Sequence, residues 1–373
     1  MSKSTNLRTT RRVRAVLGAA VAACAATALL PAAASAEPTP ATGHAAARET
    51  GVERVSVAPD GTQADDNSTG ASITPDGLHL VFSSSAQNLT PDTPAAGDRV
   101  YVRDQHTSQT KRMGSLTPLQ PPVISGDGKY VAYPVQWFND ARIRQYQVST
   151  GNTASLNCSA YSCNQPSLNA DGRYTAYAIR NLRQPSSGHR VEFQDWNTGT
   201  TQTVATLPHA QPSRPSISGD GSRVAYQDGQ AQDVFVWDRA GATTSGPVEG
   251  PSKAATIVQL SDDGSKVVYL SGSDTYVHDV SSGTAQLVPN VRGVAIDPTG
   301  RYLLHAPRDT TGPSLSLRDL QTGTDEIVSN QPASAGTDAV STDGRSVVFH
   351  STADDLVPGD TNGKSDVFVR HFD

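Results

Sequence analysis

The sequence predicts an all-β fold, a seven-bladed β-propeller of four-stranded blades, over residues 51–373. Three observations support this prediction: a unit that recurs seven times at a mean spacing of 44.5 residues, a large ring at one fixed place in most units, and a last unit that is one strand short. The spacing fits the roughly 40–45 residues of a four-stranded propeller blade.

The first 36 residues have the pattern of an export leader, and we expect cleavage after Ala36. A basic stretch precedes the apolar run AVLGAAVAACAATALL, and AAASA supplies a small-residue cleavage site. A lipid anchor at Cys24 is the alternative to a freely secreted protein, and both place the chain outside the cytoplasm. Residues 37–50 are rich in Pro, Ala and Thr and are expected to be a linker. We expect no transmembrane segment, because no later apolar run is long enough to span a bilayer.

The charge balance argues against nucleic acid as a partner. The formal net charge is −6, and it becomes −11 without the five basic residues of the leader. Phosphate backbones are bound by clustered Lys and Arg, which so acidic a chain does not favour.

A nearly constant turn opens each unit. An apolar residue is followed by Ser, Thr, Asn or Asp, whose side chain can bond its own backbone, and a glycine then supplies the positive φ of a tight reversal. We expect a hairpin between the first and second strands at each copy. The copies are ITPDG at 73–77, ISGDG at 124–128, LNADG at 168–172, ISGDG at 217–221, LSDDG at 260–264, IDPTG at 296–300 and VSTDG at 340–344.

The second strand of each unit carries a ring five residues after the turn glycine. Its other residues are β-branched or small, as in a strand buried on both faces. His305 interrupts the series, either as a buried histidine near a site or, more simply, in a divergent blade with the imidazole at an edge. The seven residues are Phe82, Tyr133, Tyr177, Tyr226, Tyr269, His305 and Phe349.

A third strand such as VYVRD or VFVWD and a fourth such as TQTV or AQLV complete the first six units. The seventh unit has no fourth strand. The segment GVERVSV at 51–57 matches the fourth-strand pattern, so we expect it to pair with 366–371. Closing the ring in this way removes a free sheet edge.

Cys158 and Cys163 are the two cysteines beyond the leader. In an oxidising compartment so close a pair is expected to form a disulfide. It would pin the link between the second and third blades.

Units of this form resemble the TolB-type, WD-repeat-like propeller repeats of bacterial secreted proteins. Residues 341–370 match the repeat best, and the resemblance covers about residues 51–373. It implies the propeller fold and says little about activity. TolB carries an additional α/β domain and six blades, so a transport role like that of TolB is not implied here.

Any binding site is expected among the second-to-third loops and blade links, or at the mouth of the central channel. These loops vary in length, whereas the other turns are short and constant. Blades two and three concentrate aromatic and arginine residues there, as at a partner hot spot, although polar loops also cluster by chance. The expected binding residues are Trp137, Phe138, Arg142, Tyr161, Arg180, Arg183 and Arg214.

No motif demands a cofactor, but DTNGKSD resembles part of a calcium loop. Asp360, Asn362 and Asp366 would supply the hard oxygen ligands that calcium prefers. An Asn-Gly pair also forms a turn without any metal, and that alternative stays open.

The sequence contains no GxSxG, HExxH, phosphate-loop or dinucleotide motif. We therefore expect a monomeric, non-catalytic protein-binding or scaffold module of the cell envelope or extracellular space, with a protein or a glycan as partner. The alternative is a propeller enzyme, a lyase or glycoside hydrolase, or a glycan-binding protein acting on envelope polysaccharide.

Overall fold

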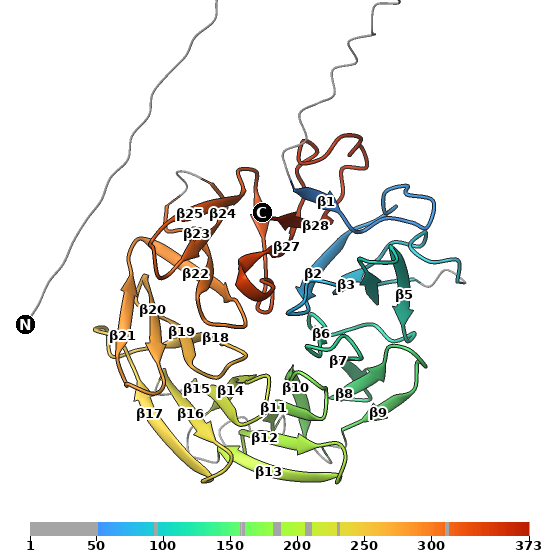
Figure 1. Cartoon of the computed structure of the whole chain (residues 1–373). Helices are drawn as coiled ribbons and strands as arrows, with labels where there is room; N and C mark the ends of the chain where they lie inside the picture. The colour runs from blue at the N-terminus through green and yellow to red at the C-terminus, as the bar shows by residue number, and fades with distance from the viewer. Residues whose placement is uncertain are drawn as a thin grey trace, which may run out of the picture. The chain divides into compact units, whose positions relative to one another are not determined.

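Seven four-stranded antiparallel sheets form a ring, as predicted (Figure 1). Among the described residues there is one short 3-10 helix, η1 (Thr342–Gly344), and no α-helix. The expected leader (1–36) and linker (37–50) lie outside the described part of the chain. The computed structural model describes residues 51–92, 96–156, 158, 161–181, 188–205, 211–229, 232–309 and 313–372.

The first six blades each use four consecutive strands, counted from the channel outward. Blade 1 comprises β2 (Ser68–Ile73), β3 (His79–Ser84), β4 (Arg99–Asp104) and β5 (Gln109–Met113). Blade 2 comprises β6 (Val123–Ile124), β7 (Tyr130–Trp137), β8 (Asp140–Gln147) and β9 (Thr153–Ser155). Blade 3 comprises β10 (Ser162–Leu168), β11 (Tyr174–Arg180), β12 (Arg190–Asp195) and β13 (Thr200–Ala205).

The next three blades repeat this order. Blade 4 comprises β14 (Pro212–Ile217), β15 (Arg223–Asp228), β16 (Asp233–Asp238) and β17 (Thr243–Val248). Blade 5 comprises β18 (Thr256–Leu260), β19 (Lys266–Ser271), β20 (Asp274–Asp279) and β21 (Ala285–Val288). Blade 6 comprises β22 (Val291–Ile296), β23 (Tyr302–Pro307), β24 (Leu315–Asp319) and β25 (Asp325–Ser329).

Blade 7 joins the two ends of the folded chain, which confirms the predicted closure. It consists of β26 (Ala333–Ser334), β27 (Ser346–Ser351), β28 (Asp366–His371) and the N-terminal β1 (Val52–Arg54). β1 runs antiparallel to β28, with Val52 opposite Arg370 and Arg54 opposite Phe368. β1 therefore covers the edge of β28 that the three C-terminal strands of this blade would leave open.

The first turn of each unit has the predicted geometry. In blade 1 Gly77 has φ +74°, and its N–H donates to Thr74 O (2.8 Å). The Thr74 hydroxyl accepts from His79 N (3.0 Å), and Asp76 accepts from Leu78 N (2.9 Å). The other turns repeat this arrangement, because a short polar side chain at the first place satisfies the backbone that the reversal exposes.

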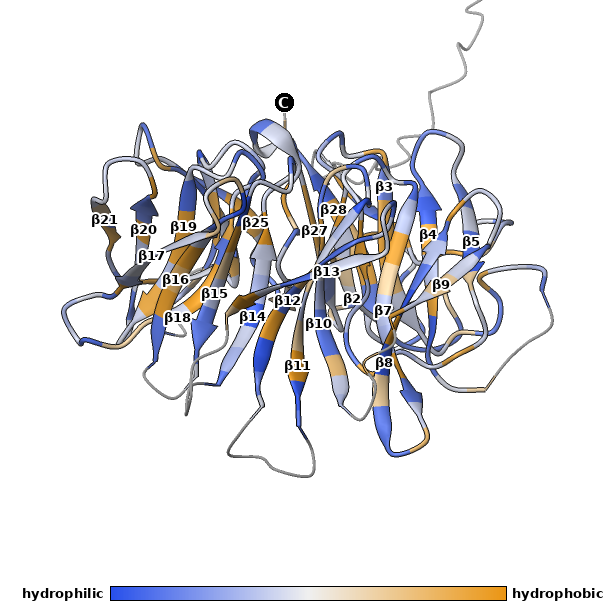
Figure 2. Cartoon of the chain, turned by 90° about the horizontal axis from the view of Figure 1, so that it is seen from below, coloured by the Kyte–Doolittle hydropathy of each residue, from blue (hydrophilic) through white to orange (hydrophobic). Residues whose placement is uncertain are grey.

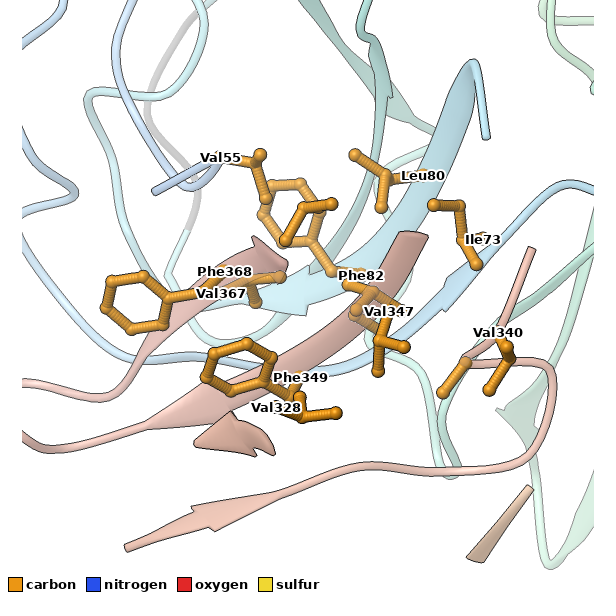
Figure 3. Packing of buried hydrophobic residues seen from close by; sticks show 14 of the residues in the cluster. Val55, Ile73, Leu80, Phe82, Val328, Val340, Val347, Phe349, Val367 and Phe368 are labelled. Atoms are coloured by element: carbon orange, nitrogen blue, oxygen red, sulfur yellow. The ribbon is translucent and has the colours of Figure 1, made fainter. Parts of the chain in front are cut away.

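Apolar side chains of neighbouring blades interlock across the seam that closes the ring. Figure 3 shows Val55 and Phe82 near Val367 and Phe368, with Phe349 beside them. All five are at most 1% exposed. Burial of such side chains is worth roughly 1.5–3 kcal/mol each, so the N-terminal segment contributes to stability through packing as well as hydrogen bonding.

The two faces of the ring differ. The face with the first-to-second turns is named here the turn face, and the face with the second-to-third loops and blade links is named the loop face. In Figure 2 the turn face lies at the top and the β7–β8 hairpin projects from the loop face at the bottom.

Candidate functional site

The central channel is wide at the loop face and almost closed at the turn face. At the loop face it opens into a cavity of about 580 Å³, here named the funnel, to which all seven blades contribute. At the turn face the free volume falls to about 30 Å³, and this end is named the floor. A ligand of drug or disaccharide size therefore fits at the loop-face end of the channel and does not fit at the floor.

Backbone hydrogen bonds between successive turns close the floor. Ala170 N donates to Gly219 O (2.8 Å), and Gly219 N donates to Asp262 O (2.7 Å). Further round, Asp263 N donates to Pro298 O (3.0 Å). These groups are satisfied by one another, so the floor is part of the scaffold.

The inner strands widen into the funnel through bulges at one height. In β14 the register shifts between Ser213 and Ser216, and Arg214 has φ +51°. Gln165 of β10 and Gly70 of β2 occupy the same place with φ +53° and +63°. A long side chain in the left-handed region costs of order 1 kcal/mol and is found preferentially at functional sites.

Side-chain bonds between neighbouring blades hold these bulges in place. The Gln120 side-chain oxygen accepts from Gln165 N (2.8 Å), and the Gln165 side-chain oxygen accepts from Arg214 N (2.9 Å). The strained backbone at Arg214 is therefore fixed, and its side chain lines the funnel.

Two arginines and a histidine give the funnel its chemistry. Arg214 and Arg292 are exposed, and neither guanidinium forms an ion pair with any described residue. His350 of β27 also lines the funnel, because the inner strand of blade 7 is only two residues long. Burial lowers the pKa of His350, so its imidazole is neutral at pH 7.

Two carboxyl groups stand at the floor. Burial, together with the nearby carboxylates of Asp338, Asp263 and Asp297, raises the pKa of Asp262 to about 7. Burial also raises the pKa of Asp338 to about 6, and Asp338 lines both the floor and the funnel. Groups that titrate near neutral pH in a cleft are candidates for proton transfer.

Gln259 connects the floor to two other blades. Its amide nitrogen donates to Asp338 Oδ1 (2.8 Å). Its carbonyl oxygen accepts from Ile296 N and from Asp338 N, both at 3.2 Å. The side chain is 3% exposed, so this one residue fixes the position of Asp338.

The predicted aromatic cluster exists on the β7–β8 hairpin. The Trp137 and Phe138 rings meet edge-on at 5.5 Å, and the Arg142 guanidinium lies 4.5 Å from the centre of the Trp137 ring. Phe138 is 86% exposed and has φ +52° at the corner of the hairpin. A bulky exposed ring in the left-handed region is rare, which makes this tip a candidate contact surface.

The other predicted binding residues divide between two places. Tyr161 carries the Arg190 guanidinium 4.8 Å above its ring, and Arg180 ends β11. Ala141 N donates to Ser162 Oγ (2.8 Å), which places this end of blade 3 beside the β7–β8 hairpin. Arg214 is apart from them in the funnel, and Arg183 lies outside the described residues.

Cys158 and Cys163 lie close together, with Cα atoms 6.0 Å apart, and the disulfide between them stays a prediction. Both are buried. Cys158 lies in the link that follows β9, and Cys163 is the second residue of β10. The pair is therefore placed where a disulfide would join blades 2 and 3.

The predicted calcium ligands lie together, and a side-chain cation is already among them. Arg54 Nη1 is 3.3 Å from Asp360 Oδ1 and 3.7 Å from Asp366 Oδ2. Asn362 donates its amide nitrogen to Asp366 (3.1 Å). Asp366 is fully buried, so Arg54 ties the N-terminal strand to the last blade through charge. Calcium binding at this loop stays a prediction.

Comparison with known proteins supports the fold and changes the functional expectation. No family model and no curated protein matches the chain. Among solved structures, an oligogalacturonate lyase in complex with manganese has a TM-score of 0.63 and 15% identity, over 86% of this chain and 93% of its own. An oligogalacturonate lyase from Vibrio parahaemolyticus has the same TM-score and coverage at 12% identity. TolB from Acinetobacter baumannii has a TM-score of 0.47 and 15% identity, over 70% of this chain and 62% of its own.

The expectation of a non-catalytic scaffold is corrected by these comparisons. Two solved structures that share the architecture over 86% of this chain are oligogalacturonate lyases, and this favours the alternative of a propeller enzyme or glycan-directed protein. At these identities the likeness itself establishes only the propeller fold. The propeller fold that the TolB-type resemblance implied is confirmed, and membership of that repeat class stays a prediction.

Sequence reasoning missed most of the funnel, although a signal was present. Seven residues before the turn glycine, each unit places a funnel residue: Gly70, Pro121, Gln165, Arg214, Ile257, Gly293 and Thr337. The next position is occupied by Pro122, Pro166, Pro215 and Asp338, which also line the funnel. Arg292 lies eight residues before its turn glycine, one residue earlier than the others. His350 directly follows Phe349, the ring residue of β27.

Proposed function

We propose that this protein is a propeller enzyme that cleaves an acidic, uronate-containing oligosaccharide bound in the funnel. The observation that carries the proposal is the presence of Arg214 and Arg292, which form no ion pair with any described residue, in the wide mouth of a seven-bladed ring. The likeness to oligogalacturonate lyases supports it at the level of architecture.

An anionic ligand accounts for the two arginines. The chain as a whole is acidic, with a net charge of −6, and yet one cavity holds two guanidinium groups that have no ion-pair partner in the described part of the chain. A guanidinium binds a carboxylate through two parallel hydrogen bonds, and the pairing strengthens where protein displaces water. Successive uronate rings would present carboxylates at both sides of the funnel.

The funnel also offers groups for β-elimination. Binding of the uronate carboxylate by Arg214 makes the proton on the adjacent ring carbon more acidic. Neutral His350 accepts that proton, and the electron pair of the broken C–H bond forms the C=C bond of the product. The C–O bond to the leaving sugar breaks, and its electron pair leaves on the sugar oxygen. The protonated form of Asp338, whose pKa is raised to about 6, returns a proton to the leaving oxygen.

The described residues do not fit a manganese ion of the kind that the similar lyase holds. No group of three or more His, Cys, Asp or Glu side chains in the described part of the chain lies close enough to hold one. Metal sites in proteins usually need at least three such ligands. No step above is therefore assigned to a metal.

Four further expectations enter the proposal. Export from the cytoplasm, the Cys158–Cys163 disulfide and membership of the TolB-type repeat class rest on the sequence patterns already described. Among the described residues no helix is long and apolar enough to cross a membrane. The fourth expectation is that Phe138 on its hairpin stacks against sugar rings of longer chains, as exposed aromatic rings do.

Incubation with defined oligosaccharides tests the proposal. Oligogalacturonate should give new reducing ends together with the ultraviolet absorbance of an unsaturated product, and a neutral oligogalactoside should give neither. New reducing ends without that absorbance would mean hydrolysis in place of elimination.

Two variants separate the roles in the same assay. Arg292→Gln should raise KM at least tenfold, because it removes a substrate contact, whereas His350→Gln should lower kcat with KM little changed. An intact, folded protein that leaves every acidic glycan uncleaved would overturn the enzyme proposal.

A further inference from the structure

Blade 6 lacks the pair of aromatic rings that four other blades carry between their second and third strands. Ring centres lie 5.8 Å apart in blade 1, 5.6 Å in blade 4, 5.4 Å in blade 5 and 5.7 Å in blade 7. In blade 6 the same cross-strand place holds His305 and Ser316. The four ring pairs are Phe82–Tyr101, Tyr226–Phe235, Tyr269–Tyr276 and Phe349–Phe368.

A cavity stands where those rings are missing. It has a volume of about 760 Å³ and is lined by His305 and Ser316, by three prolines and by four charged residues, Arg308, Asp309, Arg318 and Asp325. The prolines are Pro289, Pro307 and Pro313. This volume lies within the range of small-molecule sites, and it is separate from the funnel, since the two cavities share no lining residue.

In other blades a tyrosine hydroxyl reaches the link that enters its blade. Tyr133 donates to Met113 O (2.6 Å), at the end of the fourth strand of blade 1. Tyr269 donates to Glu249 O (3.4 Å), directly after the fourth strand of blade 4. Pro289 follows the fourth strand of blade 5 in the same way and lines the cavity. The shorter His305 offers no hydroxyl at this place.

A polar network holds His305 at the wall of the cavity. Its Nε2 lies 3.1 Å from Asp325 Oδ1, and Arg318 donates to the same carboxylate from Nε (2.7 Å) and Nη2 (2.5 Å). Because a carboxylate only accepts, Nε2 carries the proton. His305 is 5% exposed, and its Nδ1 has no hydrogen-bond partner among the described residues. His305 and Ser316 therefore do not make the ring-to-ring contact that the aromatic pairs make in the other four blades.

We infer that the blade 6 cavity binds a phenolic compound, whose ring takes the place of the missing side-chain rings and whose hydroxyl donates to the carbonyl of Pro289. The walls fit such a ligand because proline rings and an imidazole pack against the faces of an aromatic ring. Cavities left by missing apolar side chains take up small aromatic molecules of matching shape. This site is independent of the proposed glycan chemistry.

Binding of 4-methylphenol, the side-chain analogue of tyrosine, tests the inference on the purified full chain by calorimetry and thermal unfolding. We expect saturable binding, a rise in Tm of about 2 °C at ten times Kd, and affinity at least tenfold above that for 4-methylcyclohexanol, which has the hydroxyl but no aromatic ring.

Rebuilding the ring pair should remove the site. His305→Tyr with Ser316→Phe restores the pair of blade 4 and should weaken 4-methylphenol binding at least tenfold. Ser316→Phe alone serves the same purpose if the double variant does not fold. Arg214→Gly, in the funnel, is the matched control and should bind 4-methylphenol as the unaltered protein does. Absence of saturable binding, equal binding of the cyclohexanol, or undiminished binding by a folded ring-pair variant would overturn the inference.

Discussion

The two ends of the central channel are built from the same seven inner strands and differ in what satisfies their polar groups. At the floor, backbone groups of successive turns bond one another, as in the pair Gly219 N and Asp262 O. In the funnel, the inner strands bulge and present side chains such as Arg214 and Arg292, whose guanidinium groups form no ion pair with described residues.

Within one channel, the floor therefore contributes mainly to stability and the funnel mainly to ligand binding. A change at the floor breaks contacts that several blades share, so its main effect should be on the free energy of unfolding. A change at the funnel arginines removes guanidinium groups that form no ion pair with any described residue, so its main effect should be on ligand binding. The predictions below follow this order, from the largest expected effect on stability to the smallest.

The largest effect is expected from Gln259→Leu at the floor. It leaves the buried N–H of Ile296 and the part-buried N–H of Asp338 without their acceptor and should cost about 3 kcal/mol of unfolding free energy. Denaturant unfolding measures this cost. Gln120→Leu is the matched control at the wide end, where one half-buried bond is lost, and should cost about 1 kcal/mol. Equal costs at both ends would erase the distinction.

A smaller effect, which depends on pH, is expected from Asp262→Asn. The folded protein holds the Asp262 proton up to about pH 7, whereas the unfolded chain releases it near 3.8. Stability therefore falls as pH rises through this window, since the folded state binds more protons there. The variant lacks this loss, so its stability should match that of the unaltered protein at pH 4 and exceed it at pH 8. Identical pH profiles of Tm would refute the raised pKa.

Arg214→Gly should leave stability unchanged or raise it by up to about 1 kcal/mol. Glycine adopts the φ of +51° without the strain that arginine bears there. The same variant should bind oligogalacturonate at least tenfold more weakly, because a carboxylate partner is lost. Thermal unfolding and titration on one preparation measure both quantities. A marked loss of stability would instead make Arg214 a structural residue.

The smallest effect on stability is expected from Phe138→Gly at the tip of the β7–β8 hairpin. The ring is 86% exposed, and glycine suits its φ of +52°, so the unfolding free energy should change by less than about 0.5 kcal/mol. If the ring stacks against sugars, affinity should fall for long oligosaccharides and remain for dimers. Unchanged affinity for every chain length would limit the glycan site to the funnel.

The fold was predictable because its determinants are local and repeated. The turn glycine and the ring five residues later recur with little variation, and the missing strand of the last unit is matched by 51–57. Each of these sequence patterns reflects a structural requirement of a single blade. The pairing of β1 with β28 follows from counting strands, and the structure confirms it.

The site was less predictable because it depends on distortions of that regular pattern. Arg214 was expected at the loop face, but Arg292, His350 and Asp338 were not singled out. Strand alternation alone does not indicate which inner-strand side chain faces the channel once a bulge adds a residue. In the same way, the carboxylates of DTNGKSD do not reveal that Arg54, more than 300 residues away, lies among them.

Equilibrium titration of the funnel with oligogalacturonate tests the central claim most directly. The account predicts saturable binding that weakens as salt is raised, at least tenfold tighter than binding of a neutral galactose oligomer of equal length. It also predicts at least a tenfold loss on Arg214→Gln together with Arg292→Gln, with Tm preserved. Equal binding of the neutral oligomer, or full binding by a folded double variant, would contradict the claim that the funnel recognises an acidic glycan.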